Sequence, residues 1–195
     1  MCGIVRRVVS YGLDFRNRQG DRFLKTAAGP TSSVLILGGG VGGLVAANTL
    51  RRSLPKTHRV VLVDREPSFV FAPSFLWLLT GARTAAAISR PLTRLERKGI
   101  EVVRGEIERI DPGRREAVVV GRTLAGDFVV VALGAELDPA AVPGLDQAGF
   151  NFYSLAGAER LRDAFAAFTG GRIAVLTAAP AYKCPAAPYE AAMLL

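Results

Sequence analysis

The sequence predicts an α/β fold in which helices flank a parallel β-sheet. Three observations predict it: short aliphatic runs that alternate with segments of helical pattern, a glycine-rich turn after the first run, and an acidic residue that ends the second run. Strand, turn, helix, strand and acid follow one another within about 30 residues, an order typical of a Rossmann-type unit.

The first strand is expected over residues 34–37, directly before the turn Gly38-Gly39-Gly40-Val41-Gly42-Gly43. In a Rossmann-type turn, Gly38 permits the tight bend, Gly40 lets a pyrophosphate approach the backbone, and Gly43 lets the helix pack on the strand. The helix expected over residues 44–54 presents N–H groups and its dipole to negative charge. The predicted pyrophosphate site consists of Gly38, Gly40, Val41, Gly42 and Gly43.

The second strand is expected over residues 59–63 and leads into Asp64. This acid follows the last glycine by about 20 residues, where a carboxylate would hold a ribose hydroxyl. Glu66 offers an alternative carboxylate, and Arg65 between the two is a further candidate for cofactor contact. The competing interpretation is a glycine-rich loop beside a strand-end acid with no ligand, and the order of the elements favours the nucleotide.

An irregular segment is expected over residues 65–81, which carry four aromatic residues around Pro73 without a regular period. We expect this segment to run over the nucleotide edge of the sheet. Phe71, Phe75 and Trp77 could face a cofactor, although an aromatic cluster is more often part of the core.

A β-hairpin is predicted after the third strand. A helix over residues 91–98 is expected to lead into a parallel strand over residues 100–104. Two alternating stretches, 106–110 and 116–120, follow and are joined by Asp111-Pro112-Gly113, whose Pro and Gly favour a tight turn. The sequence therefore predicts a hairpin inserted into the α/β sheet.

A further buried parallel strand is predicted over residues 128–133, where every residue is apolar. Gly134 ends this strand at the nucleotide edge. The first domain is therefore expected to extend over residues 33–145. A basic tail over residues 1–32, which we expect to be disordered, precedes it.

The start of a second α/β domain is predicted over residues 150–195. A helix over residues 156–168 is followed by Gly170-Gly171, a helix-ending signal. A buried strand is expected over residues 173–176, and Pro188 begins a helix that continues to the end of the sequence.

The composition argues against a nucleic-acid-binding protein and against a secreted disulfide-rich protein. The chain has 195 residues, of which 50% are hydrophobic and 22% charged, as in a globular protein. The net charge of +8 comes from scattered arginines without interleaved aromatic residues, which argues against nucleic acid as a partner. Two cysteines, Cys2 and Cys184, are too few for a secreted disulfide scaffold. They predict a cytoplasmic location, which includes a peripheral place on the cytoplasmic membrane.

Candidate nucleophiles and metal ligands are few. No metal site is predicted, because His58 is the sole histidine and the two cysteines lie far apart in the sequence. His58, between basic residues in a helix-to-strand loop, is expected to be solvated. Cys184 stands beside Lys183 and shortly before a helix N-terminus, two features that favour a reactive thiolate, and the alternative is a packed structural cysteine.

Two segments resemble a known family of flavoproteins. Residues 33–145, with the glycine turn, Asp64, the hairpin and the strand ending at Gly134, resemble the first flavin-binding segment of FAD oxidoreductases with two dinucleotide domains. Residues 182–190, Tyr-Lys-Cys-Pro-Ala-Ala-Pro-Tyr-Glu, resemble the redox-cysteine segment of sulfide:quinone oxidoreductases and of the flavin subunit of flavocytochrome c sulfide dehydrogenase. The resemblance implies a Rossmann-type FAD-binding unit in an FAD-dependent oxidoreductase.

The resemblance also implies roles for single residues. Cys184 would take up sulfur from sulfide or a small thiol and pass two electrons to FAD, which would reduce a quinone. The residues that the resemblance assigns to FAD are Gly38, Gly40, Val41, Gly42, Gly43, Asp64, Arg65 and Gly134.

Several family features are missing from this sequence. Thr177-Ala178-Ala179-Pro180 stands where a second glycine fingerprint would follow residues 173–176, which disfavours NAD(P)H and hence a type II NADH dehydrogenase. In the family, the strand at the flavin edge usually ends in Ala-Thr-Gly. In this sequence it ends in Ala132-Leu133-Gly134, so the contact of a threonine hydroxyl is absent. The family's second redox cysteine, the return half of the FAD domain and the C-terminal membrane-contacting helices would all follow residue 195. We expect an N-terminal portion completed by a second chain or oligomer, or alternatively a non-catalytic nucleotide-binding fragment.

Overall fold

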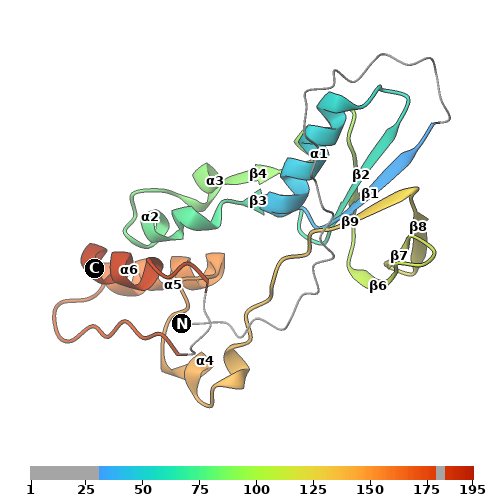
Figure 1. Cartoon of the computed structure of the whole chain (residues 1–195). Coiled ribbons are helices and arrows are strands. Elements are labelled where there is room, and N and C mark those ends of the chain that lie inside the picture. Colours follow the sequence, from blue (N-terminus) through green and yellow to red (C-terminus); the bar gives the residue numbers. More distant parts are fainter. Residues whose placement is uncertain (1–30, 179–182) are drawn as a thin grey trace, which may run out of the picture. The chain divides into compact units, whose positions relative to one another are not determined.

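The computed structural model describes residues 31–178 and 183–195, which form two compact units (Figure 1). The sheet unit comprises residues 31–67 and 93–134, and the helical unit comprises the described parts of residues 68–92 and 135–195. Apart from its last two residues, the predicted tail over residues 1–32, with Cys2, lies outside the described residues.

The sheet unit is built on a four-stranded parallel sheet, as the aliphatic runs predict. Its two central strands are buried almost throughout, which explains why they read as continuous aliphatic runs rather than alternating patterns. The strands are β1 (Ser33–Leu37), β2 (Arg59–Asp64), β5 (Glu101–Arg104) and β9 (Phe128–Val131), in the spatial order β5-β2-β1-β9.

Helix α1 (Val41–Ser53) carries the chain from β1 to β2. Its last turn is closed by Arg51, whose guanidinium donates to the carbonyl oxygens of Leu54 at 3.0 Å and His58 at 2.8 Å. His58 is half-buried, and its Nδ1 accepts a hydrogen bond from the Ser32 N–H at 3.0 Å. His58 is therefore partly rather than fully solvated, because its loop is bonded to the end of α1 and to the residue before β1.

A three-stranded antiparallel meander follows β5, formed by β6 (Ile107–Asp111), β7 (Glu116–Val119) and β8 (Arg122–Ala125). Two side chains of β7, Ala117 and Val119, pack against β1 and β2, the central strands of the parallel sheet. The predicted hairpin corresponds to β6 and β7, whereas β8 was missed. The turn before β8 is Val120-Gly121, with φ of 47° and 70°, and a valine at such a position hides the Asn-Gly signal that usually marks a hairpin.

Val120 is a stabilisation target, because a β-branched side chain strains a backbone at positive φ. We expect Val120→Asn to raise the free energy of unfolding by about 1 kcal/mol, since asparagine tolerates this conformation. Urea denaturation of the two proteins measures the difference. Val45→Asn, at an equally exposed position within α1, is the control and should change stability little, as the two residues have similar helix propensities. Equal changes in the free energy of unfolding for the two substitutions would contradict the claim that Val120 is strained.

Strand β9 is joined to the start of β1 and occupies residues 128–131 of the strand predicted over residues 128–133. The prediction of a buried strand was wrong, because β9 is an edge strand in which Phe128 and Val131 are 61% and 53% exposed. The Asp127 carboxylate accepts hydrogen bonds from the Ser33 N–H at 2.7 Å and from its hydroxyl at 3.0 Å. These bonds, the backbone one above all, hold the pKa of Asp127 below its ordinary value.

The helical unit contains short helices and one two-stranded antiparallel ribbon. Its ribbon strands are β3 (Ser68–Val70) and β4 (Ser89–Pro91). Its helices are η1 (Ala72–Ser74), α2 (Phe75–Leu79), α3 (Ala85–Ile88), η3 (Pro139–Ala141), α4 (Leu145–Ala148), α5 (Leu155–Ala166) and α6 (Ala187–Leu194). The helix predicted over residues 91–98 is present as the 3-10 helix η2 (Leu92–Lys98), which continues from β4 into the sheet unit.

Helix α2 lies at the centre of this unit, inside the segment that we expected to be irregular. It contributes Phe75 and Leu78 to one buried cluster and Leu76 and Leu79 to another, so that it is buried on opposite sides. A five-residue helix buried on both sides has no polar face, and its sequence therefore shows no helical period. The helices predicted over residues 156–168 and from Pro188 are confirmed as α5 and α6.

The strand predicted over residues 173–176 is not formed. Ile173 and Leu176 are instead 47% and 60% exposed. A strand needs a neighbour for its N–H and C=O groups, and none of the described elements of the helical unit pairs with this segment. The predicted division into residues 33–145 and 150–195 remains a prediction.

Candidate nucleotide site

The predicted cofactor residues of the sheet unit gather at one edge of the parallel sheet. The parallel strands β1, β2 and β9 end at the same edge of the sheet (Figure 1). Asp64 is the last residue of β2, and Gly38 and Gly134 follow β1 and β9, so that the three residues belong to this edge. Strand β1 pairs with β2 on one side and with β9 on the other. The strand order therefore reverses at β1, and open α/β sheets bind ligands at such a switch point.

Two glycines of the turn are required by packing. Gly38 has φ of +105° and donates its N–H to the Val63 carbonyl at 2.8 Å, and a Cβ on it would overlap the carbonyl oxygen of Ala132. A Cβ on Gly43 would overlap the carbonyl oxygen of Gly38. The turn is thus pressed against the end of β9, and α1 is pressed against the turn.

The next part of the turn is open. Gly40 is the N-cap of α1 with φ of −71°, and a Cβ on it would meet no atom within 4 Å. The helix has no side-chain cap and no acid in its first turn, and Val41 is 61% exposed. The first N–H groups of α1 therefore face space that an anion can fill, and the helix dipole favours a negative charge there.

Asp64 lies directly against the glycine turn. One carboxylate oxygen accepts a hydrogen bond from the Gly39 N–H, and the other accepts from the Glu66 N–H at 2.7 Å. Each oxygen has a further lone pair with which it can accept a ribose hydroxyl. The Glu66 carboxylate instead lies 3.7 Å from the Arg65 guanidinium. The geometry favours Asp64 over Glu66 as the acid of this site.

Arg65 and Gly134 lie at the border of the candidate site and leave it open to solvent. The Arg65 guanidinium lies 3.6 Å from the Glu106 carboxylate, and because both side chains are more than half exposed, this ion pair contributes little energy. Gly134 has φ of +73°, which glycine adopts without strain, and a Cβ there would meet no atom within 4 Å.

Cys184 belongs to the helical unit and precedes α6. It is exposed and unpaired, so the alternative of a packed structural cysteine is wrong. Its φ is +47°, and its carbonyl accepts a hydrogen bond from the Ala187 N–H at 3.1 Å. The thiol is therefore carried on a tight turn and is accessible to small reagents.

The three candidate aromatic residues have different environments. Phe75 is buried in the core of the helical unit, as its alternative interpretation required. Phe71 and Trp77 are 45% and 47% exposed. The Arg83 guanidinium lies 5.6 Å from the centre of the Trp77 ring and donates to the Ser74 hydroxyl at 2.8 Å. Trp77 thus has a cation–π partner.

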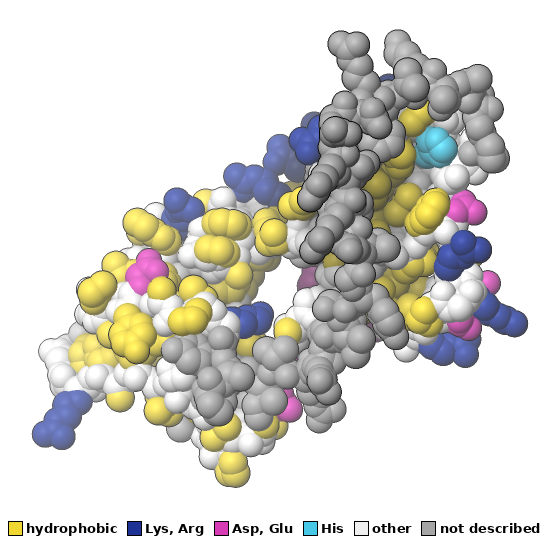
Figure 2. All heavy atoms as spheres, in the orientation of Figure 1, with side chains coloured by type: hydrophobic (Ala, Val, Ile, Leu, Met, Phe, Trp, Pro, Cys, Tyr) yellow, Lys and Arg dark blue, Asp and Glu magenta, His cyan; other side chains and the backbone are white. Residues whose placement is uncertain are grey.

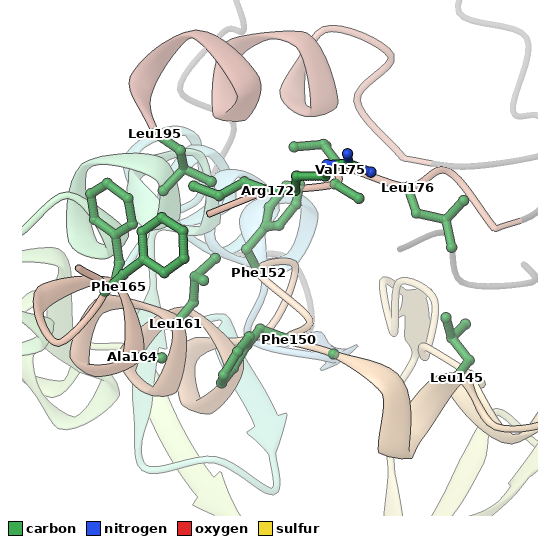
Figure 3. A pocket seen from close by; sticks show the side chains of 14 residues that line it. Leu145, Phe150, Phe152, Leu161, Ala164, Phe165, Arg172, Val175, Leu176 and Leu195 are labelled. Carbon is green, nitrogen blue, oxygen red and sulfur yellow. The ribbon is translucent and has the colours of Figure 1, made fainter. Parts of the chain in front are cut away.

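Sequence reasoning missed an apolar pocket in the helical unit. It has a volume of about 470 Å³ and is lined by α5, by residues between Leu145 and Phe152, by residues 172–176 and by Leu195 (Figure 3). Among the described residues that line it, Arg172 is the charged one. Further hydrophobic side chains are exposed on this unit (Figure 2). Among them, Met193 on α6 is 82% exposed. A lining with so few polar groups does not suit a second dinucleotide. The pocket depends on residues 172–176, which form no helix or strand, lying beside α5, and no local pattern predicts this arrangement.

Two further classes of site have no candidate in the described residues. No group of three or more His, Cys, Asp and Glu side chains that could hold a metal is present among them. None of the helices formed by residues 31–178 and 183–195 combines the length and hydrophobicity needed to cross a membrane.

Comparison with known proteins identifies a family and several relatives. The sequence model of the pyridine nucleotide-disulphide oxidoreductases matches residues 32–181. The chain is 32% identical to the sulfide-quinone reductase of Aquifex aeolicus over 171 residues, which are 83% of this chain and 38% of that protein. It is 34% identical to the alternative NAD(P)H-ubiquinone oxidoreductase C1 of Arabidopsis thaliana over 148 residues, 67% of this chain and 28% of that protein.

The fold is shared with a solved structure from the same group. The crystal structure of the sulfide:quinone oxidoreductase from Aquifex aeolicus superposes with a TM-score of 0.66 at 28% sequence identity, covering 70% of this chain and 32% of that one. The chain thus spans about a third of the length of these relatives.

Proposed function

Because the chain belongs to the pyridine nucleotide-disulphide oxidoreductase family of FAD-dependent oxidoreductases, we propose that it forms the FAD-binding portion of an oxidoreductase that passes electrons to a quinone. One observation carries the proposal: an open, acid-free helix N-terminus, a glycine turn and Asp64 meet at one edge of a parallel sheet. The proposed location is the cytoplasm, with a peripheral place on the membrane that holds the quinone.

The residues at the sheet edge fit FAD. The N–H groups of Gly40, Val41 and Gly42 would bind the pyrophosphate, and Asp64 would hold the ribose of the adenosine half. Gly134 would leave room at the end of β9, and Arg65 would lie at the rim. FAD, when bound, accepts electrons as a pair and releases them singly, which is chemistry that no side chain supplies.

We further propose sulfide as the electron donor and Cys184 as the residue that receives its sulfur. Support comes from the likeness to the sulfide-quinone reductase and from the exposed thiol beside Lys183. Hydrosulfide would attack a disulfide between Cys184 and a second cysteine, so that a persulfide forms on Cys184 and the second cysteine leaves as a thiolate. The second cysteine would come from a partner chain or would be Cys184 of a second copy of this chain, so that Cys2 takes no part in the step.

Two other functions have support of their own. The likeness to the NAD(P)H-ubiquinone oxidoreductase favours NAD(P)H as the donor, whereas the lack of a glycine fingerprint at Thr177 opposes it. A non-catalytic nucleotide-binding fragment or assembly subunit is consistent with the third of the relatives' length that the chain spans.

Anaerobic titration separates these functions. The purified chain is mixed with FAD and desalted, and flavin absorbance is followed while sulfide or NADH is added. We expect retained flavin that sulfide bleaches and NADH does not. Bleaching by NADH would support the second function, and retained flavin that neither donor bleaches would support the third. Protein that emerges without flavin would contradict all three.

We expect Cys184→Ser to abolish sulfide-dependent bleaching while FAD is retained at the parent level. A hydroxyl cannot form the persulfide, and Cys184 is in the helical unit rather than in the glycine turn. Stopped-flow absorbance at the flavin band measures the rate. Cys2→Ser is the matched control. A Cys184→Ser variant that bleaches at the parent rate would remove this cysteine from the reaction.

We expect Asp64→Ala to weaken FAD binding about 10- to 100-fold, because the ribose loses a charged hydrogen-bond acceptor. Isothermal titration calorimetry measures the dissociation constant. Glu66→Ala, two residues along, serves as the control and should bind almost as the parent does. If Glu66→Ala proved the weaker binder, Glu66 would be the ribose acid.

A further inference from the structure

We propose that Tyr153 is a positioning residue for Cys184, because its hydroxyl fixes the backbone that carries the thiol. The inference rests on the proposed function, in which Cys184 receives sulfur. The Tyr153 hydroxyl donates a hydrogen bond to the carbonyl oxygen of Lys183 at 2.8 Å and lies 3.2 Å from that of Cys184. Tyr153 and Cys184 are 31 positions apart in the sequence, so no local motif joins them.

Tyr153 is itself held firmly. Its N–H donates to the Asn151 side-chain oxygen at 3.0 Å, and the next residue, Ser154, caps the first turn of α5. Its ring lies 5.2 Å from that of Phe152, which is 7% exposed in a buried cluster. The hydroxyl is therefore presented from a rigid helix start.

The turn at Cys184 needs such an anchor. Its φ of +47° is a conformation that a side chain disfavours, so the turn would relax without outside contacts. On its C-terminal side, Ala187 donates to the Cys184 carbonyl, and Ala187 and Ala191 are buried in the same cluster as Phe152. Tyr153 joins the preceding peptide to that cluster. The exposed thiol is thus held on a fixed support.

The experiment uses the full chain with Cys2→Ser, so that Cys184 is the single thiol. Tyr153→Phe removes the hydroxyl and keeps the ring. A nitroxide label on Cys184 reports its mobility by electron paramagnetic resonance, and hydrogen exchange reports the Ala187 amide. We expect Tyr153→Phe to convert a restricted spectrum into a mobile one and to speed Ala187 exchange about tenfold. Tyr189→Phe, the same change at a 71% exposed position on α6, should match the parent.

Neither readout requires FAD or sulfide, so a failed proposed function leaves the result unaffected. A general loss of stability would not change the label's mobility far below the melting temperature, which separates positioning from a merely structural role. Unchanged spectra and exchange in Tyr153→Phe, or equal changes in Tyr189→Phe, would overturn the proposal. Should Tyr153→Phe fail to fold, nuclear magnetic resonance of the parent decides: a slowly exchanging Tyr153 hydroxyl proton supports the hydrogen bond, and a rapidly exchanging one overturns it.

Discussion

Replacing Gly43 by alanine is expected to lower the free energy of unfolding by about 3 kcal/mol and to prevent retention of FAD. The added methyl group would overlap the carbonyl oxygen of Gly38 and lie 3.0 Å from the carbon of that carbonyl. Gly38 has little room to retreat, because its N–H is bonded to the Val63 carbonyl and the Ala132 carbonyl oxygen lies directly beside the position that a Cβ of Gly38 would take. Helix α1 would have to move away from the sheet.

Gly42→Ala is the matched control for this experiment. It places the same methyl group in the same turn of α1, where the nearest atom would be the Ala132 Cβ at an ordinary 3.6 Å. Alanine also has a higher helix propensity than glycine, so this variant should be as stable as the parent or more stable. Chemical denaturation without FAD compares the three proteins. Similar losses in both variants would indicate that glycine is required for flexibility and not for close packing.

Gly40→Val is expected to leave folding intact and to weaken FAD binding at least about 100-fold. The backbone of Gly40 is in a region open to all residues, and its side-chain direction leads into empty space. A valine there should change the stability of the FAD-free protein by no more than about 1 kcal/mol. Its branched side chain would, however, occupy the volume that the pyrophosphate needs.

Calorimetric titration with FAD measures this loss. Gly149→Val is the control, because Gly149 also has extended backbone, a Cβ on it would meet no atom within 4 Å, and it belongs to the helical unit. It should bind FAD as the parent does. Parent-like affinity in Gly40→Val would mean that the phosphates do not approach this turn, and the proposed cofactor site would be wrong.

The parallel sheet and the glycine turn could be predicted because their signals are local. A buried strand, a turn that only glycines can form and an acid at a strand end each depend on neighbouring residues. The meander strand β8 escaped prediction because Val120 occupies a turn position that usually carries asparagine. The unformed strand over residues 173–176 shows the opposite error, since an apolar run is a strand only when a neighbour pairs with it.

In the candidate site, too, some features follow from local sequence signals and others depend on contacts that the sequence does not reveal. That Gly38, Asp64 and Gly134 meet follows from the parallel topology, which the sequence order predicts. The choice between Asp64 and Glu66 required coordinates, because both carboxylates are within two residues of the strand end. The contact between Tyr153 and the Cys184 turn could not be predicted, because it joins two loops that are distant in sequence.

The glycine turn packs closely against the chain at the end of β9. During biosynthesis, the nucleotide site can therefore form only after β9 has been made. The partners that join β1 to β9, such as Ser33 and Asp127, are 94 residues apart. A nascent chain can form β1, α1 and β2 early. The contact between Gly38 and the Ala132 carbonyl, however, cannot form until residues 128–132 have been translated. Such long-range closure is slow compared with helix formation. The coenzyme can therefore be captured only after Ala132 and the strand before it have left the ribosome.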